Sequence, residues 1–115
     1  MAKNAFRPEA VEELIAVCTT TDTEASAQTL ARALVERRLA ACVQISAIDS
    51  VYRWKGEVQT AAEYRLRVKT TVSRGDAVRA LLLALHPYEL PAIWSERMES
   101  VLPGYADWVR ANSTG

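Results

Sequence analysis

The feature that most constrains this chain is the order in which its hydrophobic repeat changes. Strand-like runs, compact or alternating in apolar residues, occupy residues 14–20, 40–54, 64–70 and 92–101. Segments with the three- and four-residue spacing of amphipathic helices occupy residues 24–39, 73–85 and 105–111. The order predicts β-α-β-β-α-β with an extra C-terminal helix. Right-handed crossovers place the first two helices on one face of an antiparallel sheet, which is a ferredoxin-like α+β sandwich.

Capping residues mark the expected helix boundaries. We expect the first helix to begin after residues 21–23, which offer hydroxyl and carboxylate caps, and to end near Arg38 and Leu39. Ser73 is expected to cap the second helix, with Asp76 in its first turn. The core stripe of this second helix is expected to comprise Val78, Leu81, Leu82 and Leu85.

A hairpin is predicted at Lys55-Gly56-Glu57, because this turn signal separates two β-rich runs. The incoming strand is long, and we expect a bend or bulge in it near Asp49. In the returning strand, Arg65, Arg67 and Lys69 alternate with apolar residues and therefore share one face. That face is either solvated, covered by another subunit, or lining an anion pocket.

Composition excludes several classes of protein. The 115 residues suit a single domain, expected over residues 11–115, preceded by a disordered tail over residues 1–10. Fourteen basic and fourteen acidic residues cancel, so we expect no nucleic-acid partner. No apolar run approaches the roughly 20 residues that span a membrane, and the N-terminus lacks the apolar core of a secretory signal. We therefore expect a cytoplasmic protein with free thiols at Cys18 and Cys42.

The stretch from Leu85 to Pro91 follows the second helix and holds the only histidine, His86. Pro87 disfavours helical backbone at His86, so the helix is expected to end there. An imidazole, a phenol and a carboxylate then lie within four residues, at His86, Tyr88 and Glu89. This stretch is either a rigid corner or part of a functional site.

Catalytic patterns are weak in this sequence. The glycines are isolated, His86 has no nucleophile motif beside it, and no carboxylates are paired for acid–base work, so we do not expect an enzyme. Metal binding is the stronger possibility, because a thiolate and an imidazole suit copper or zinc. Cys18 and His86 are expected at the same end of the molecule. Two ligands are too few for a closed structural site, and a buried inert thiol is the alternative for Cys18.

Several motifs together resemble the divalent-cation tolerance (CutA) family. They are Val17-Cys18-Thr19, Leu39-Ala40-Ala41-Cys42-Val43, Tyr52-Arg53-Trp54-Lys55-Gly56, Val68-Lys69-Thr70-Thr71, His86-Pro87-Tyr88-Glu89-Leu90-Pro91 and Tyr105-Ala106-Asp107-Trp108. The resemblance implies a cytosolic homotrimer with the architecture of PII signalling proteins, in which long hairpins pair with neighbouring chains. It also implies a role in tolerance of divalent cations and a weak copper(II) site at Cys18 and His86.

The chain departs from the family pattern near this implied site. Leu85 stands where some members carry a second histidine, and Ala92 stands where glutamate is common. Two functions therefore remain open. One is a metal-responsive protein that binds copper(II) or another divalent cation. The other is a PII-like regulatory or structural trimer that binds a small ligand or a protein partner in an intersubunit cleft, for which the candidate residues are Trp54, Lys69, Tyr88 and Glu89.

Overall fold

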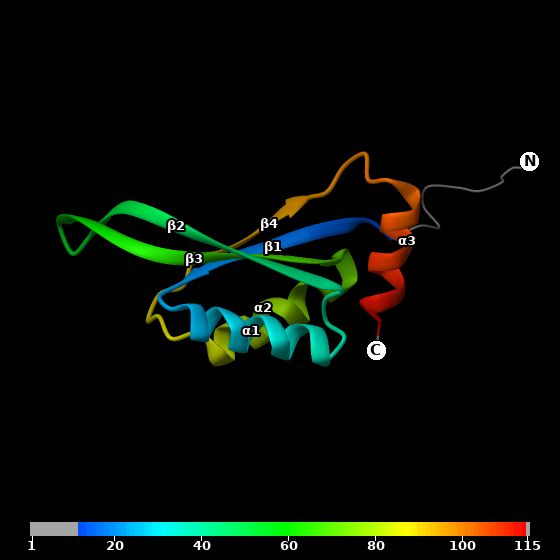
Figure 1. The fold of residues 1–115 in the computed structure, drawn as a ribbon, viewed down its shortest axis with the longest axis horizontal. Helices are drawn as coiled ribbons and strands as arrows, with labels where there is room; N and C mark the ends of the chain where they lie inside the picture. Colours follow the sequence, from blue (N-terminus) through cyan, green and yellow to red (C-terminus); the bar gives the residue numbers. More distant parts are fainter. Residues whose placement is uncertain (1–11, 115) are drawn as a thin grey trace, which may run out of the picture.

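A four-stranded antiparallel sheet with two helices on one face organises the chain in this computed structural model, which describes residues 12–114 (Figure 1). The predicted tail, residues 1–10, lies outside the described residues. The strands are β1 (Leu14–Thr21), β2 (Cys42–Trp54), β3 (Glu57–Thr71) and β4 (Ile93–Arg97). The helices are α1 (Glu24–Glu36), α2 (Gly75–Leu85) and α3 (Pro103–Asn112), with a 3-10 turn, η2 (Val72–Arg74), before α2.

The strand order across the sheet is β2-β3-β1-β4, and every neighbouring pair is antiparallel. This confirms the predicted ferredoxin-like arrangement with an added C-terminal helix. β1 and β3 lie in the centre, while β2 and β4 form the two edges. The β2–β3 hairpin extends well beyond the ends of β1 and β4, away from α3 (Figure 1).

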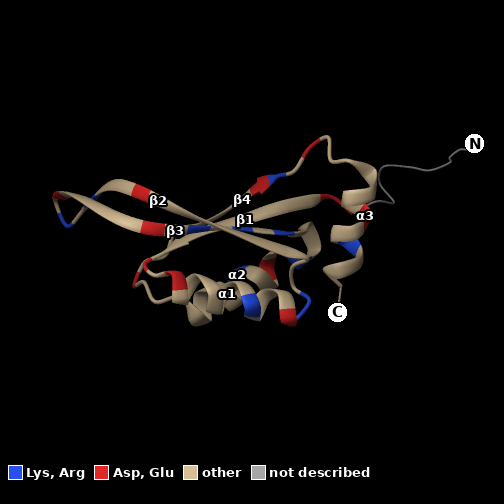
Figure 2. Ribbon diagram, viewed as in Figure 1, with Lys and Arg blue, Asp and Glu red and all other residues tan. Residues whose placement is uncertain are grey.

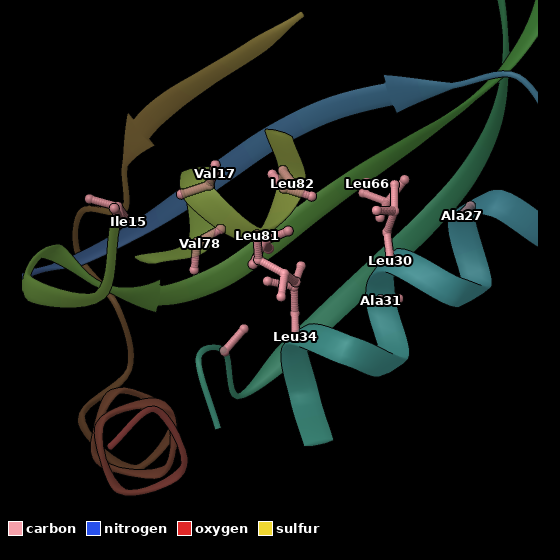
Figure 3. Packing of buried hydrophobic residues seen from close by; sticks show 12 residues of the cluster. Ile15, Val17, Ala27, Leu30, Ala31, Leu34, Leu66, Val78, Leu81 and Leu82 are labelled. Carbon is pink, nitrogen blue, oxygen red and sulfur yellow. The ribbon is translucent and has the colours of Figure 1, made fainter. Parts of the chain in front are cut away.

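The main core lies between the sheet and the helices α1 and α2 (Figure 3). Each element contributes apolar side chains at the period that its sequence predicts: every second residue from the strands, and every third or fourth from the helices. Its fully or nearly fully buried members include Val17, Leu30, Leu34, Leu66, Val68, Val78 and Leu82. A smaller cluster attaches α3 to the sheet through Leu14, Ala41, Ala106 and Val109.

The boundaries of all three helices differ from the prediction, and α3 spans Pro103–Asn112 rather than residues 105–111 because Pro103 is tolerated in its first turn. α1 ends at Glu36 rather than near residues 38–39, because Arg38 adopts a left-handed backbone with φ 58°. The Arg38 side chain instead donates to the carbonyls of Ala111 and Thr114, at 2.8 Å each, near the end of α3. At α2, the predicted cap by Ser73 is wrong, since η2 precedes the helix and the cap residue is Arg74, with no side-chain hydrogen bond.

Leu85 does not belong to the core stripe of α2. Its side chain is 43% exposed, whereas Val78, Leu81 and Leu82 are buried. The helix ends at this residue, where His86 turns to an extended backbone with φ −70° and ψ 136°. The chain therefore leaves the helix before Leu85 reaches the sheet.

The hairpin forms as predicted but without the expected bulge near Asp49. Pairing runs without interruption from Cys42–Lys69 to Trp54–Glu57, with Asp49 opposite Ala62. The turn residues Lys55 and Gly56 have φ of 51° and 83°, the left-handed pair that suits a tight hairpin turn. Matched residue numbers on the two strands leave no extra residue to bulge.

Candidate functional site

A groove of about 750 Å³ lies where the β2–β3 hairpin leaves the body of the sheet. We call it the hairpin groove. Its walls come from the outer half of β2, from β3, from the end of β1, from the chain between α2 and β4, and from β4 itself. Six aromatic or acidic side chains give it its chemical character: Tyr52, Trp54, Glu63, Tyr88, Glu89 and Trp94.

The His86 imidazole fixes the wall that carries Tyr88. Nε2 lies 2.9 Å from the Thr20 carbonyl, and Nδ1 lies 3.1 Å from the backbone nitrogen of Tyr88. Because a carbonyl only accepts and a backbone N–H only donates, Nε2 carries the proton and Nδ1 accepts. The Thr19 hydroxyl lies 3.1 Å from the same Nε2. His86 therefore connects the chain after α2 to the end of β1.

Tyr88 closes the groove floor by donating its hydroxyl to Glu63 Oε2 at 2.6 Å. Glu63 is buried, with 8% of its surface exposed. Burial raises the pKa of Tyr88 well above its usual range, and the hydrogen bond to the Glu63 carboxylate and its charge add to the shift. Tyr88 is therefore a protonated donor at neutral pH, and its ring tilts against His86 at a centroid distance of 5.0 Å.

Three of the four predicted ligand-binding residues line this groove: Trp54, Tyr88 and Glu89. Lys69 does not. It pairs with Cys42 and Ala16 in the part of the sheet near α3, and its Nζ lies 5.5 Å from the ring centroid of Tyr105. The site was predicted for a cleft between subunits, so these placements within one chain leave it a prediction.

Cys18 lies in the middle of β1 on the open face of the sheet, the face opposite α1 and α2. Its cross-strand neighbours are Arg67 on β3 and Trp94 on β4. The thiol is fully buried, and the Arg67 guanidinium donates to Sγ at 3.7 Å. Burial raises the pKa of the Cys18 thiol, as does the nearby Glu96 carboxylate, against the opposing effect of Arg67. The protonated thiol is therefore favoured, whereas a metal ligand must be a thiolate.

The described residues do not bring Cys18 and His86 together in one chain. His86 contacts Thr19, whose cross-strand neighbours Leu66 and Ile93 belong to the core under the helices. Adjacent residues of a strand face opposite sides of a sheet, so Thr19, which contacts His86, faces the side opposite Cys18. Both ring nitrogens of His86 are already hydrogen bonded. Residues 12–114 contain no group of three or more His, Cys, Asp or Glu that could hold a metal ion.

Sequence reasoning missed Glu63, Tyr52 and Trp94 as groove residues. Glu63 continues the alternation of Arg65 and Arg67 and reads as one more charge on a strand face. The one signal that could have singled it out is its sign, since it is acidic on a face of cations. Its contact with Tyr88 joins residues 25 positions apart, and only the packing of the chain after α2 against the hairpin creates it.

Comparison with known proteins assigns the family. The family model described as CutA1 divalent ion tolerance protein matches residues 15–112. This chain belongs to the CutA1 family. The resemblance predicted from the sequence motifs is thereby confirmed.

Relatives match over nearly their full length. The divalent-cation tolerance protein CutA of Thermus thermophilus is 41% identical over 104 residues, which cover 90% of this chain and 99% of that protein. The protein of the same name from Thermotoga maritima is 39% identical over 97 residues, covering 84% and 96%. These relatives are named for tolerance of divalent cations and not for a chemical reaction.

Solved structures share the fold. CutA from Synechococcus elongatus has a TM-score of 0.86 at 39% identity and covers 90% of this chain and 93% of that one. A structure described as the PII-like protein CutA from Nostoc in apo form has a TM-score of 0.81 at 31% identity, covering 88% and 97%. The chain thus has the PII-like CutA fold. Within residues 12–114, no helix has the length and apolar character needed to cross a membrane.

Proposed function

We propose that this chain takes part in tolerance of divalent cations as a non-enzymatic homotrimer. The observation that carries the proposal is the family match over residues 15–112. Both ring nitrogens of His86, the only histidine, bond to backbone groups. Both cysteines are free, which supports a cytoplasmic location as part of the same proposal.

The sheet itself supports assembly. α1 and α2 cover one face, while on the open face α3 covers only the end near Leu14, and the rest carries both charged and apolar side chains. β2 and β4 are edge strands with unpaired backbone groups, which natural proteins usually pair or cover. A second and third copy would satisfy both requirements. Light scattering should give the mass of three 12.7 kDa chains, and a monomer would refute this part of the proposal.

The proposal includes only weak copper(II) binding, through Cys18 or His86 separately; we call this the restricted form. The Cys18 thiol bonds to Ala16 and Arg67, whereas the His86 ring bonds to Thr19, Thr20 and Tyr88. One chain therefore offers copper a single protein ligand at either position. Closed metal sites use about four ligands, so binding through one ligand is weak. We therefore expect weak copper(II) binding that does not require both residues at once.

A calorimetric copper(II) titration of the reduced protein tests this expectation. Cys18→Ala and His86→Ala should each leave part of the weak binding, and Cys42→Ala is the matched control for loss of a thiol. The opposite outcome is tight, saturable binding by the unaltered protein that each single variant loses completely. It would show that the two residues share one site across chains. That result would contradict the restricted form.

A second candidate function is a PII-like regulatory trimer that binds a small ligand. The hairpin groove favours it, because it is concave, aromatic and holds a few placed polar groups, as small-molecule sites do. The hairpin also extends beyond the body of the sheet (Figure 1), so the groove lies at the place where a neighbouring copy would approach. The class of ligand follows from the charges of the groove.

A further inference from the structure

We propose that the hairpin groove binds a small organic cation of the alkylammonium class. The proposal names the ligand class for the second candidate function, and it rests on that function only in taking the groove as a ligand site. Two independent observations carry it. One is a buried carboxylate without a cationic partner, and the other is an aromatic wall that already accepts an ammonium group.

The carboxylate is that of Glu63. Glu63 is buried, with an exposed fraction of 8%. Among the described residues, its only side-chain hydrogen bond comes from the Tyr88 hydroxyl. Among residues 12–114, no lysine or arginine lines the groove and no ion pair includes Glu63. A buried carboxylate is costly unless a cation compensates it. Glu89, in the same groove, adds a second negative charge.

The aromatic wall is formed by Tyr52, Trp54 and Trp94, which are all partly exposed. The Lys55 ammonium lies 5.8 Å from the ring centroid of Trp54, within cation–π range. Trp54 therefore already attracts an ammonium group on one face in the structure. A ligand cation in the groove would meet rings of the same kind together with the two carboxylates.

A second groove serves for comparison, because some of its acidic residues have ion-pair partners within the chain. It has a volume of about 860 Å³ and lies beside α3. There Glu13 pairs with Arg97, and Asp107 pairs with Arg110 at 3.2 Å. Two acids of the α3 groove, Glu13 and Asp107, thus have an arginine partner within the chain, whereas no ion pair of the described residues includes Glu63 or Glu89.

The same features exclude other ligand classes. An anion would meet two carboxylates and no lining cation, and a neutral molecule would leave the Glu63 charge uncompensated. A bare metal ion needs several ligands close together, and residues 12–114 hold no cluster of three His, Cys, Asp or Glu. An alkylammonium uses both parts of the groove, because its charge faces Glu63 while its alkyl chain lies against the rings.

Three probes that share a five-carbon chain test the charge. They are 1,5-diaminopentane, 1,5-pentanediol and glutarate, which are cationic, neutral and anionic at neutral pH. Isothermal titration calorimetry on the full chain, in its native assembly, should show saturable binding of the diamine. The affinity for the diol should be lower by a factor of roughly ten or more, because the diol gains no charge-assisted hydrogen bond. Glutarate should not bind.

Variants locate the site. Glu63→Gln keeps the size of the side chain and removes its charge, and it should weaken diamine binding roughly tenfold. Glu89→Gln is an exposed position whose change does not endanger the fold, and it should weaken binding by a smaller factor. Trp54→Leu should also weaken it, through the lost cation–π contact. Glu36→Gln, an exposed carboxylate at the end of α1, is the matched control and should bind as the unaltered protein does.

Light scattering on the same samples separates this proposal from the trimer. A trimer in which diamine, diol and glutarate bind equally, or not at all, overturns the alkylammonium site and leaves the assembly intact. That result includes the case in which a side chain of a neighbouring copy fills the groove. Selective diamine binding by a monomer supports the site and refutes the trimer. Equal binding by Glu63→Gln and the unaltered, folded protein overturns the role of Glu63.

Discussion

The body of the sheet and the projecting hairpin are built from the same kind of strand but are stabilised differently. In β1, seven of eight residues are buried, because α1 and α2 cover one face and β3 and β4 flank both edges. Along the hairpin, most residues from 49 to 60 are exposed, including Val51 at 70% and Val58 at 64%. Figure 2 also shows acidic segments on both strands where the hairpin leaves the body.

The difference separates what one chain can stabilise from what it cannot. The body buries a continuous apolar core (Figure 3), which is the dominant favourable contribution to folding. The hairpin has uninterrupted backbone pairing, but a two-stranded ribbon alone is marginally stable in water. We infer that the outer hairpin depends on contacts with other copies or with a ligand. Three experiments test this contrast.

The largest expected effect is in the body. Leu66→Ala should lower the free energy of unfolding by about 3 kcal/mol, because it leaves a cavity at a fully buried position of β3. Val58→Ala is the matched truncation on the hairpin and should cost less than about 1 kcal/mol. Urea unfolding measures both. The Val58 effect should grow with protein concentration, since only another molecule can bury that side chain.

A similar loss in both variants at high dilution would remove the contrast between body and hairpin. It would mean that the chain stabilises its own hairpin as firmly as its core. An effect of Val58→Ala that does not change with concentration would contradict the dependence on other copies.

A smaller effect is expected at the hairpin turn. Gly56→Ala should destabilise the protein by about 1 kcal/mol, because Gly56 has φ 83° and a β-carbon is strained there. Gly104→Ala is the control, since neither position has an atom within 4 Å of an added β-carbon. Gly104 lies in α3, where alanine is favoured, so this change should be neutral or stabilise by up to about 1 kcal/mol. Thermal unfolding compares them, and equal shifts would exclude backbone strain at the turn.

The smallest expected effect concerns alkaline pH. The pKa of the Cys18 thiol and that of the Tyr88 phenol are both raised in the folded protein, mainly by burial. For an acid with a raised pKa, the folded state holds the proton more tightly than the unfolded chain. Its contribution is therefore full below the unfolded pKa and is lost as the pH rises towards the folded pKa. Stability should begin to fall above pH 9.0 through Cys18 in the body and above pH 10.0 through Tyr88 in the hairpin groove.

Urea midpoints measured from about pH 8 to about pH 11 test the two contributions separately. Cys18→Ala should flatten the first part of the decline, and Tyr88→Phe should flatten the part above pH 10.0. Cys42→Ala controls for the loss of a thiol elsewhere. An unchanged pH profile in Tyr88→Phe would show that Tyr88 does not hold its proton more tightly in the folded state.

Much of the fold could be predicted because its signals are local. The strand and helix periods, the turn at Lys55-Gly56 and the helix end before Pro87 all depend on neighbouring residues. Errors arose where a distant contact decided the local structure. Arg38, for example, leaves α1 early and caps the end of α3, which is more than 70 residues away.

The candidate site was only partly predictable. Trp54, Tyr88 and Glu89 were predicted to lie near one another, and they line one groove, because aromatic and polar residues near a turn or helix end are informative by themselves. Within one chain Lys69 lies away from these residues, and Cys18 and His86 have different bonding partners, because sequence distance does not tell which face of the sheet a side chain occupies. A shift of one residue along β1 puts Cys18 on one face and Thr19, the contact of His86, on the other.

The sequence by itself determined the order of elements, the ferredoxin-like topology and the family, since these depend on periodicity, turn chemistry and motif order. Only the tertiary structure decided which charged groups meet. It buried Glu63 beside Tyr88 without an ion-pair partner among the described residues, and it bonded Cys18 to Arg67 but His86 to Thr19 and Thr20. The physical reason is that hydrophobic periodicity acts within a segment, whereas the pairing of charges depends on the packing of segments far apart in the chain.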